Sequence, residues 1–82
     1  MTTTLTSEQI RAGRMLLRWS QQDLASASGV SLASIKRLEA KPGRLEAHGP
    51  TISALERAYE KAGIEFIPEN GGGLGVRARK QS

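Results

Sequence analysis

Two adjacent basic residues near the middle of the chain, Lys36 and Arg37, have side chains suited to reading DNA bases. An arginine can donate two hydrogen bonds to O6 and N7 of a guanine, and a lysine can reach a guanine or a phosphate. Both lie in residues 31–40, where a capping serine, helical spacing and the following Lys-Pro-Gly predict one helix. Leu32 and Ala33, on the same outward face, can contact thymine methyl groups. The expected base-reading residues are therefore Leu32, Ala33, Lys36 and Arg37.

A pattern of apolar and small residues over residues 21–40 predicts how that helix is positioned. Two short helices joined at a glycine cross at a steep angle and must bury one shared face. The positions of that face hold Leu24, Ala25, Gly29, Val30, Ile35 and Leu38, at the spacing of a helix-turn-helix unit. Ser28 stands where a larger apolar residue is more usual. Leu32 has a second interpretation, because it also falls at three-residue spacing with Ile35 and Leu38 and so fits a buried stripe.

Polar residues at the helix starts, and basic residues in the loop after residue 40, are suited to binding phosphate. Hydroxyl, amide and free backbone N–H groups at the first turn of a helix bind phosphate and fix the register on the duplex. Lys41 and Arg44 add positive charge in the loop. The expected phosphate contacts are Gln21, Gln22, Ser31, Ser34, Lys41 and Arg44.

Cap and stop residues predict the helices that support this unit. Ser7 is expected to cap a first helix that runs to about Arg18, and Ser20 a second. Pro50 opens a fourth helix, which ends at Gly63. The predicted domain therefore covers residues 7–63, with residues 1–6 as a disordered N-terminal arm and residues 21–40 as the reading unit.

Residues 64–82 differ in character from the helical part. Residues 64–67 and 74–79 read as two strands, and Asn70-Gly71 between them is a strong turn pair. We expect a hairpin, with a flexible glycine-rich tail as the alternative. Because an isolated two-stranded ribbon is hardly stable in water, a hairpin here must lie on another part of the protein.

Composition narrows the classes of protein to consider. The chain has 82 residues, enough for one domain, and a formal net charge of +4 that favours a polyanionic partner. It has no cysteine and one histidine, so a disulfide is impossible and a Cys/His zinc site is excluded. We see no secretory signal, no apolar stretch of membrane-spanning length and no catalytic pattern. We therefore expect a cytoplasmic, nucleoid-associated protein that is not an enzyme and needs no cofactor, metal or small-molecule ligand.

The helix-turn-helix residues resemble the lambda-repressor/Cro-like, or XRE, family of bacterial and phage regulators. The resemblance spans about residues 7–62. It is carried by Gln21-Gln22-Asp23-Leu24-Ala25, Gly29-Val30-Ser31 and Ile35-Lys36-Arg37-Leu38-Glu39. It implies a mainly α fold, a compact domain of four to five helices, and operator binding, commonly as a two-fold dimer.

The same resemblance assigns further residues. Arg14 and Glu39 resemble a structural pair that links the first and third helices in this family. By analogy with short members such as antitoxins, residues 64–82 would help two copies pair. The candidate dimer contacts are Ile64, Phe66, Ile67 and Val76.

Two functions remain open at this point. The first is a transcriptional regulator, expected to be a repressor, that binds double-stranded DNA as a homodimer on an inverted-repeat operator. The alternative is an antitoxin-like or other protein-binding module that holds a toxin or another regulator through residues 64–82.

Overall fold

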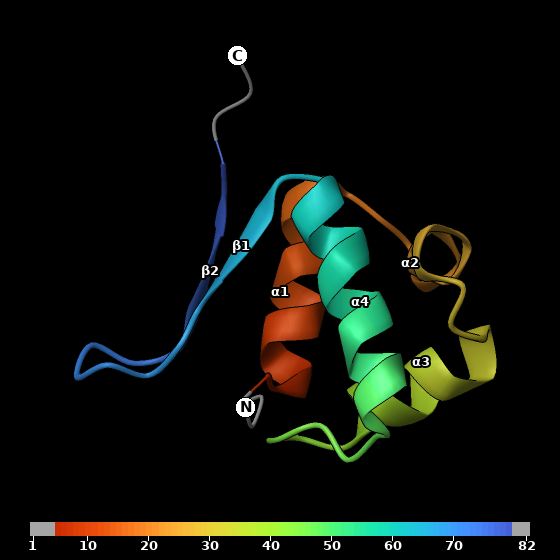
Figure 1. Ribbon diagram of the computed structural model, residues 1–82, viewed down its shortest axis with the longest axis horizontal. Helices are drawn as coiled ribbons and strands as arrows, with labels where there is room; N and C mark the ends of the chain where they lie inside the picture. Colours follow the sequence, from red (N-terminus) through yellow and green to blue (C-terminus); the bar gives the residue numbers. More distant parts are fainter. Residues whose placement is uncertain (1–4, 80–82) are drawn as a thin grey trace.

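Four helices followed by one antiparallel hairpin make up the computed structural model, which describes residues 5–79 (Figure 1). The elements are α1 (Ser7–Leu17), α2 (Gln21–Ser28), α3 (Leu32–Ala40), α4 (Gly49–Lys61), β1 (Ile64–Ile67) and β2 (Gly75–Ala78). This arrangement confirms the predicted mainly α fold with a C-terminal hairpin. Within the described part of the chain, no helix is both long and apolar enough to cross a membrane.

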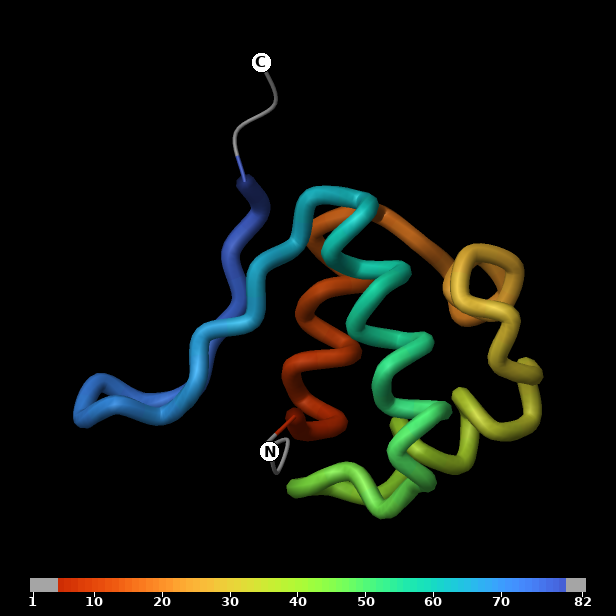
Figure 2. Tube along the Cα trace, in the orientation of Figure 1, coloured from red at the N-terminus to blue at the C-terminus, as the bar shows by residue number. Residues whose placement is uncertain are grey.

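The helices enclose one apolar core, and the hairpin lies on its outer side. The trace in Figure 2 shows α1 and α4 running in the same general direction, with α2 and α3 on one side and the hairpin on the other. The buried apolar residues are Leu5, Ile10, Leu24, Ala25, Ile35, Leu38, Leu45, Ile52, Leu55, Ala58, Tyr59 and Ile64. Tyr59 is fully buried, stacks on Trp19 and meets the edge of Phe66, so one aromatic cluster joins α4 to the α1–α2 connection and to β1.

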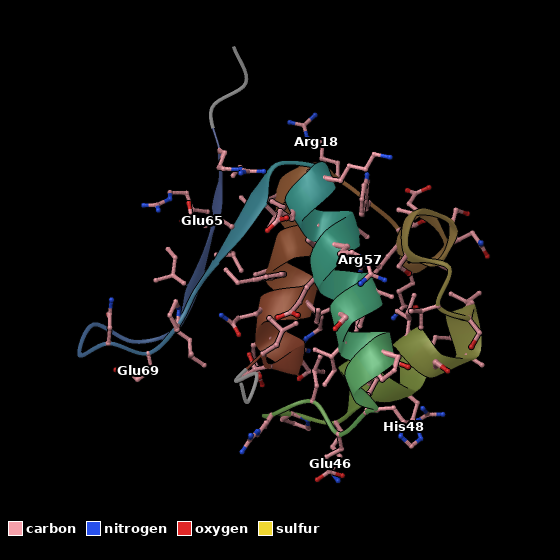
Figure 3. The ribbon with its side chains drawn as sticks, in the orientation of Figure 1. Arg18, Glu46, His48, Arg57, Glu65 and Glu69 are labelled. Carbon is pink, nitrogen blue, oxygen red and sulfur yellow. The ribbon has the colours of Figure 1, made fainter. Side chains whose placement is uncertain are left out.

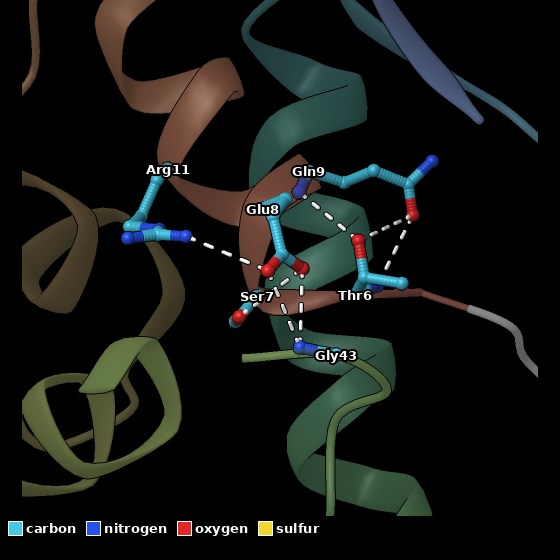
Figure 4. Close-up of polar contacts among 6 residues, drawn as sticks. All are labelled: Thr6, Ser7, Glu8, Gln9, Arg11 and Gly43. Carbon is cyan, nitrogen blue, oxygen red and sulfur yellow. Dashed lines mark hydrogen bonds and ion pairs between the residues drawn. The ribbon is translucent and has the colours of Figure 1, made fainter. Parts of the chain in front are cut away.

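The first helix begins differently from the prediction, because Thr6 and not Ser7 is its cap (Figure 4). The Thr6 hydroxyl accepts a hydrogen bond from the Gln9 N–H, and the Gln9 side chain accepts one from the Thr6 N–H. Leu5 is 4% exposed, and its carbonyl accepts a hydrogen bond from the Leu45 N–H. The predicted disordered arm is therefore wrong at residues 5 and 6, which are packed against the loop after α3; residues 1–4 lie outside the described residues.

The second and third helices have the predicted caps. The Ser20 hydroxyl accepts from the Asp23 N–H and the Asp23 carboxylate accepts from the Ser20 N–H, which closes a capping box. Gly29 ends α2 in the left-handed conformation at φ 79°, a region open to glycine at little cost. The Ser31 hydroxyl then accepts from the Ser34 N–H and starts α3. The residues that end α2 and start α3 are therefore the ones that the local sequence predicts.

The hairpin follows α4 directly and is held on the domain by side chains. Helix α4 starts at Gly49, one residue before the predicted Pro50. The strands pair antiparallel, from Ile64 opposite Ala78 to Ile67 opposite Gly75, and the return strand is shorter than residues 74–79. The Gln9 amide donates to the carbonyls of both Ile67 and Gly75. These hydrogen bonds hold the ribbon on α1, and Phe66 of β1 packs on Tyr59 of α4, so the two-stranded sheet has the support that it requires.

Candidate nucleic-acid interface

One face of α3 points away from the core and carries the predicted base-reading residues. Ala33, Lys36 and Arg37 are exposed, whereas Ile35 and Leu38 on the opposite face are buried. Leu32 is only partly exposed and packs against the core. The interpretation of Leu32 as part of the buried stripe is therefore correct for part of its side chain. Lys36, Arg37 and Ala33 therefore form the accessible part of the predicted reading surface.

The contact between α2 and α3 has the apolar pattern expected from the sequence. Figure 1 shows α2 nearly end-on and α3 lying across the view, so the two helices cross steeply. Leu24 and Ala25 of α2 are buried with Ile35 of α3. The Ser28 hydroxyl donates to the Leu24 carbonyl at 2.7 Å and accepts from the Val30 N–H at 3.1 Å. Serine is therefore tolerated at this position because its hydroxyl bonds to the turn itself.

A buried carboxylate joins the first three helices behind the exposed face of α3. Arg14 donates two hydrogen bonds to Glu39, from Nε to Oε2 and from Nη2 to Oε1, both at 2.7 Å. Arg14 Nη1 also donates to the Trp19 carbonyl, and Gln21 Nε2 donates to Glu39 Oε1 at 3.1 Å. The hydrogen bond to Glu39 raises the pKa of Arg14, while burial opposes that rise. Arg14 and Glu39 thus contact each other as expected, and they fix the start of α2 relative to α3.

The sequence predicts that the Gln21 side chain binds a DNA phosphate, but in the structure its amide group donates a hydrogen bond to Glu39 instead. The other candidates on these helices are more open. Ser31 donates from its hydroxyl to that of Ser34 at 2.9 Å, an exposed contact at the first turn of α3. Gln22 is exposed and donates to Ser26 at 3.4 Å, a long hydrogen bond that another acceptor can replace.

Three basic side chains from α3 and the following loop line one hollow of about 180 Å³: Arg37, Lys41 and Arg44. Lys41 Nζ lies 2.6 Å from Glu46, and the two side chains are 65% and 70% exposed. The Lys41 ammonium also holds the pKa of the Glu46 carboxyl below its usual value. An ion pair this exposed contributes little stability, so a phosphate can replace the carboxylate.

The sequence did not indicate which residues lie beside Arg37 on the side that faces the start of α4. Arg37 and Glu46 also line a second hollow with His48 and Thr51, at the start of α4. Figure 3 shows Glu46 and His48 close to this end of α4. The only sequence signal was that residues 41–50 form a loop directly before a helix, which does not place them beside α3.

The architecture now defines the class of protein. A small helical domain in which two steeply crossed helices expose one face of the second is a DNA-binding domain of the helix-turn-helix class. A comparison with known families agrees: the family described as helix-turn-helix matches residues 10–66, so the chain belongs to this lambda-repressor-like, or XRE, family of DNA-binding transcriptional regulators. A comparison with curated proteins finds no match to the chain.

Proposed function

We propose that the protein represses transcription by binding an inverted-repeat operator as two copies, each with α3 in a major groove. The observation that carries this proposal is the position of Arg37. It stands on the exposed face of α3 and lines the same hollow as Lys41 and Arg44. Arg37 and the two cationic side chains proposed to bind phosphate thus lie side by side, where they can contact one stretch of duplex.

The residues divide between reading and positioning. Arg37 bonds to a guanine, Lys36 reaches a neighbouring guanine or phosphate, and Ala33 contacts a thymine methyl group. The exposed part of Leu32 adds a second apolar contact. Lys41 and Arg44 bind the backbone on one side of the groove. Gln22, Ser31 and Ser34 bind it on the other, where the first turns of α2 and α3 also offer backbone N–H groups.

Two copies read two half-sites. Paired helix-turn-helix units place their reading helices in successive major grooves about 34 Å apart, so the operator should be an inverted repeat. Occupancy of such a site blocks access for other proteins. In this proposal the protein acts on DNA in the cytoplasm and uses no cofactor.

The test is selection of bound duplexes from a random library at near-physiological salt, followed by titration of variants. Wild-type protein should enrich an inverted repeat with half-sites one helical turn apart. Arg37→Ala should weaken binding by about 1–3 kcal/mol and relax preference at one base pair per half-site. Lys41→Ala should weaken binding to all sequences alike and reduce the dependence on salt.

Lys61→Ala is the matched control, because Lys61 is an exposed cation at the far end of α4. It should leave both affinity and base preference close to wild type. Equal affinity of the wild-type protein for every duplex would refute sequence-specific binding. An unchanged base preference in Arg37→Ala would remove Arg37 from the reading residues.

A groove beside β1 favours a second function, the binding of a protein partner through residues 64–82. It has a volume of about 600 Å³ and lies between β1 and the charged side chains Glu56, Arg57 and Glu60 of α4. An extended segment of a toxin or another regulator could add to the open edge of β1 there. Wild-type protein should capture such a partner from a lysate, and Glu60→Lys should not. Equal capture by both proteins would exclude this groove.

A further inference from the structure

Residues 5–8 and residues 43–45 form a loop contact, which joins the start of the chain to the segment after α3. Two backbone hydrogen bonds cross this loop contact, one of them from the Ser7 N–H to the Gly43 carbonyl at 2.9 Å. Residues 5–8 are buried except for the last of them. The first turn of α1 is therefore a fixed support for the loop that follows α3.

Glu8 adds a side-chain hydrogen bond to the loop contact (Figure 4). Its two carboxylate oxygens lie 3.2 and 3.3 Å from the Gly43 nitrogen, and both accept from the Gly43 N–H. Its side chain is 53% exposed, and a guanidinium nitrogen of Arg11 lies 3.6 Å from it. Hydrogen bonds from the N–H groups of Glu8 itself and of Gly43 lower the pKa of the Glu8 carboxyl, so it is ionised at neutral pH. A charged acceptor therefore holds the backbone N–H of Gly43.

Gly43 sets the direction of the loop. Its φ is 93°, in the left-handed region that glycine reaches at little cost. Glycine has many backbone conformations of similar energy, so the contacts of its N–H and C=O groups select among them. Here the N–H is held by Glu8, and the carbonyl is held by the Ser7 N–H. Both groups of Gly43 thus depend on the first turn of α1.

Arg44 follows Gly43 directly, and its position depends on the loop contact. Lys41 comes directly after α3, so the helix itself positions Lys41, whereas three residues of loop separate Arg44 from α3. Arg44 forms an antiparallel bridge with Thr6 and lines the same hollow as Arg37. The conformation of Gly43 therefore decides where Arg44 lies relative to the predicted reading surface.

We propose that Glu8 is a positioning residue for DNA binding: by holding the Gly43 N–H, it keeps Arg44 where it can bind a DNA phosphate. This inference rests on the proposed function only for the role of Arg44 as a phosphate ligand. Glu8 itself touches no DNA and acts through Arg44. Charge alone predicts the opposite effect, because loss of a carboxylate leaves the protein more positive and strengthens its attraction to DNA.

Three substitutions of Glu8 separate the hydrogen bond from the charge. Glu8→Asp keeps the charge and the acidic residue in the first turn of α1, but its side chain is shorter by a methylene group and should not reach the Gly43 N–H. Glu8→Gln loses the charge and keeps an acceptor oxygen at the same reach, whereas Glu8→Ala removes both. The matched control is Glu60→Asp, the same change at an exposed residue near the far end of α4.

Binding is measured on the duplex that wild-type protein selects and on a duplex of unrelated sequence. Glu8→Asp should bind both about 3- to 10-fold more weakly than wild type, the scale of one net hydrogen bond, with unchanged base preference. Glu8→Ala should bind more weakly than Glu8→Gln by a similar factor, and Glu60→Asp should bind like wild type. The salt dependence of Glu8→Asp should decrease toward that of Arg44→Ala. When Arg44→Ala is already present, Glu8→Asp should have no further effect.

A second measurement needs no DNA. The Gly43 amide hydrogen should exchange with solvent faster in Glu8→Asp than in wild type, while the helical circular dichroism of the two proteins stays the same. Wild-type affinity of Glu8→Asp, an equal loss with and without Arg44, or an unchanged exchange rate at Gly43 would overturn the proposal. Wild-type protein that binds all duplexes equally would refute the proposed function alone, because the comparison of Glu8 variants on those duplexes still tests the role of Glu8.

Discussion

The buried carboxylate of Glu39 leads to the sharpest prediction about stability. Its side chain is 4% exposed and is held by Arg14, whose side chain is 16% exposed, through two hydrogen bonds of 2.7 Å. Replacing Arg14 by methionine removes the cation and keeps most of the packing volume. Because arginine and methionine have similar helix propensities, α1 itself should be little affected. The substitution therefore isolates the cost of leaving Glu39 without its cation.

Breaking a buried ion pair from one side costs about 3–5 kcal/mol. The lower end applies here, because Arg14 is not fully buried and Gln21 continues to donate one hydrogen bond to Glu39. A protein of this length has a free energy of unfolding of roughly 4–12 kcal/mol. Arg14→Met should thus remove about 3 kcal/mol, a large share of the total. The added substitution Glu39→Leu should restore most of the loss, since it removes the unpaired charge.

Urea unfolding followed by helical circular dichroism and by the fluorescence of Trp19 measures these changes. Arg11→Met is the matched control, because Arg11 lies on the same helix in an exposed pair with Glu8 at 3.6 Å. It should change the free energy of unfolding by less than about 0.5 kcal/mol. If Arg14→Met costs no more than Arg11→Met, or if the double variant is no more stable than Arg14→Met, the reasoning about the buried charge is wrong.

Three further predictions concern packing, pH and capping. A Cβ at Gly13 would lie 2.9 Å from Cε1 of the buried Tyr59 ring, so Gly13→Ala should lower the free energy of unfolding by about 1 kcal/mol despite its better helix propensity. Burial raises the pKa of the Tyr59 hydroxyl, so as the pH rises the unfolded chain loses this proton before the folded chain does. The free energy of unfolding, measured by urea titration, should therefore fall above about pH 10. The Tyr59→Phe variant should not show this fall. Ser20→Ala should cost about 1 kcal/mol of stability, whereas Ser20→Asp should cost almost none. If Gly13→Ala stabilises the protein, the packing argument is wrong. If stability still falls at alkaline pH in Tyr59→Phe, the fall does not come from Tyr59. If Ser20→Ala and Ser20→Asp lose the same stability, the capping argument is wrong.

Much of the fold follows from signals within a few residues of each other. Ser20, Gly29 and Ser31 set the ends of α2 and α3, and each acts on a neighbour no more than four residues away. The apolar spacing of residues 21–40 then fixes which face is buried and leaves Lys36 and Arg37 outside. These parts were predictable because local backbone preference and burial favour the same structure.

The remaining features depend on residues far apart in the chain. Thr6 replaces Ser7 as the cap because Leu5 enters the core and the Ser7 N–H donates to the Gly43 carbonyl. Gln21 turns to Glu39 because the carboxylate accepts a third hydrogen bond there. Since these contacts form only after the chain has folded, spacing in the sequence does not encode them.

Gln9 gives the fold a particular order of assembly. Its amide oxygen accepts from the Thr6 N–H at the start of α1, while its amide nitrogen donates to carbonyls 58 and 66 residues further along the chain. During synthesis the first helix is made early, but the hydrogen bonds of Gln9 stay incomplete until Gly75 has been made. The N-terminal turn and the hairpin should therefore become protected from hydrogen exchange together, as one late cooperative step.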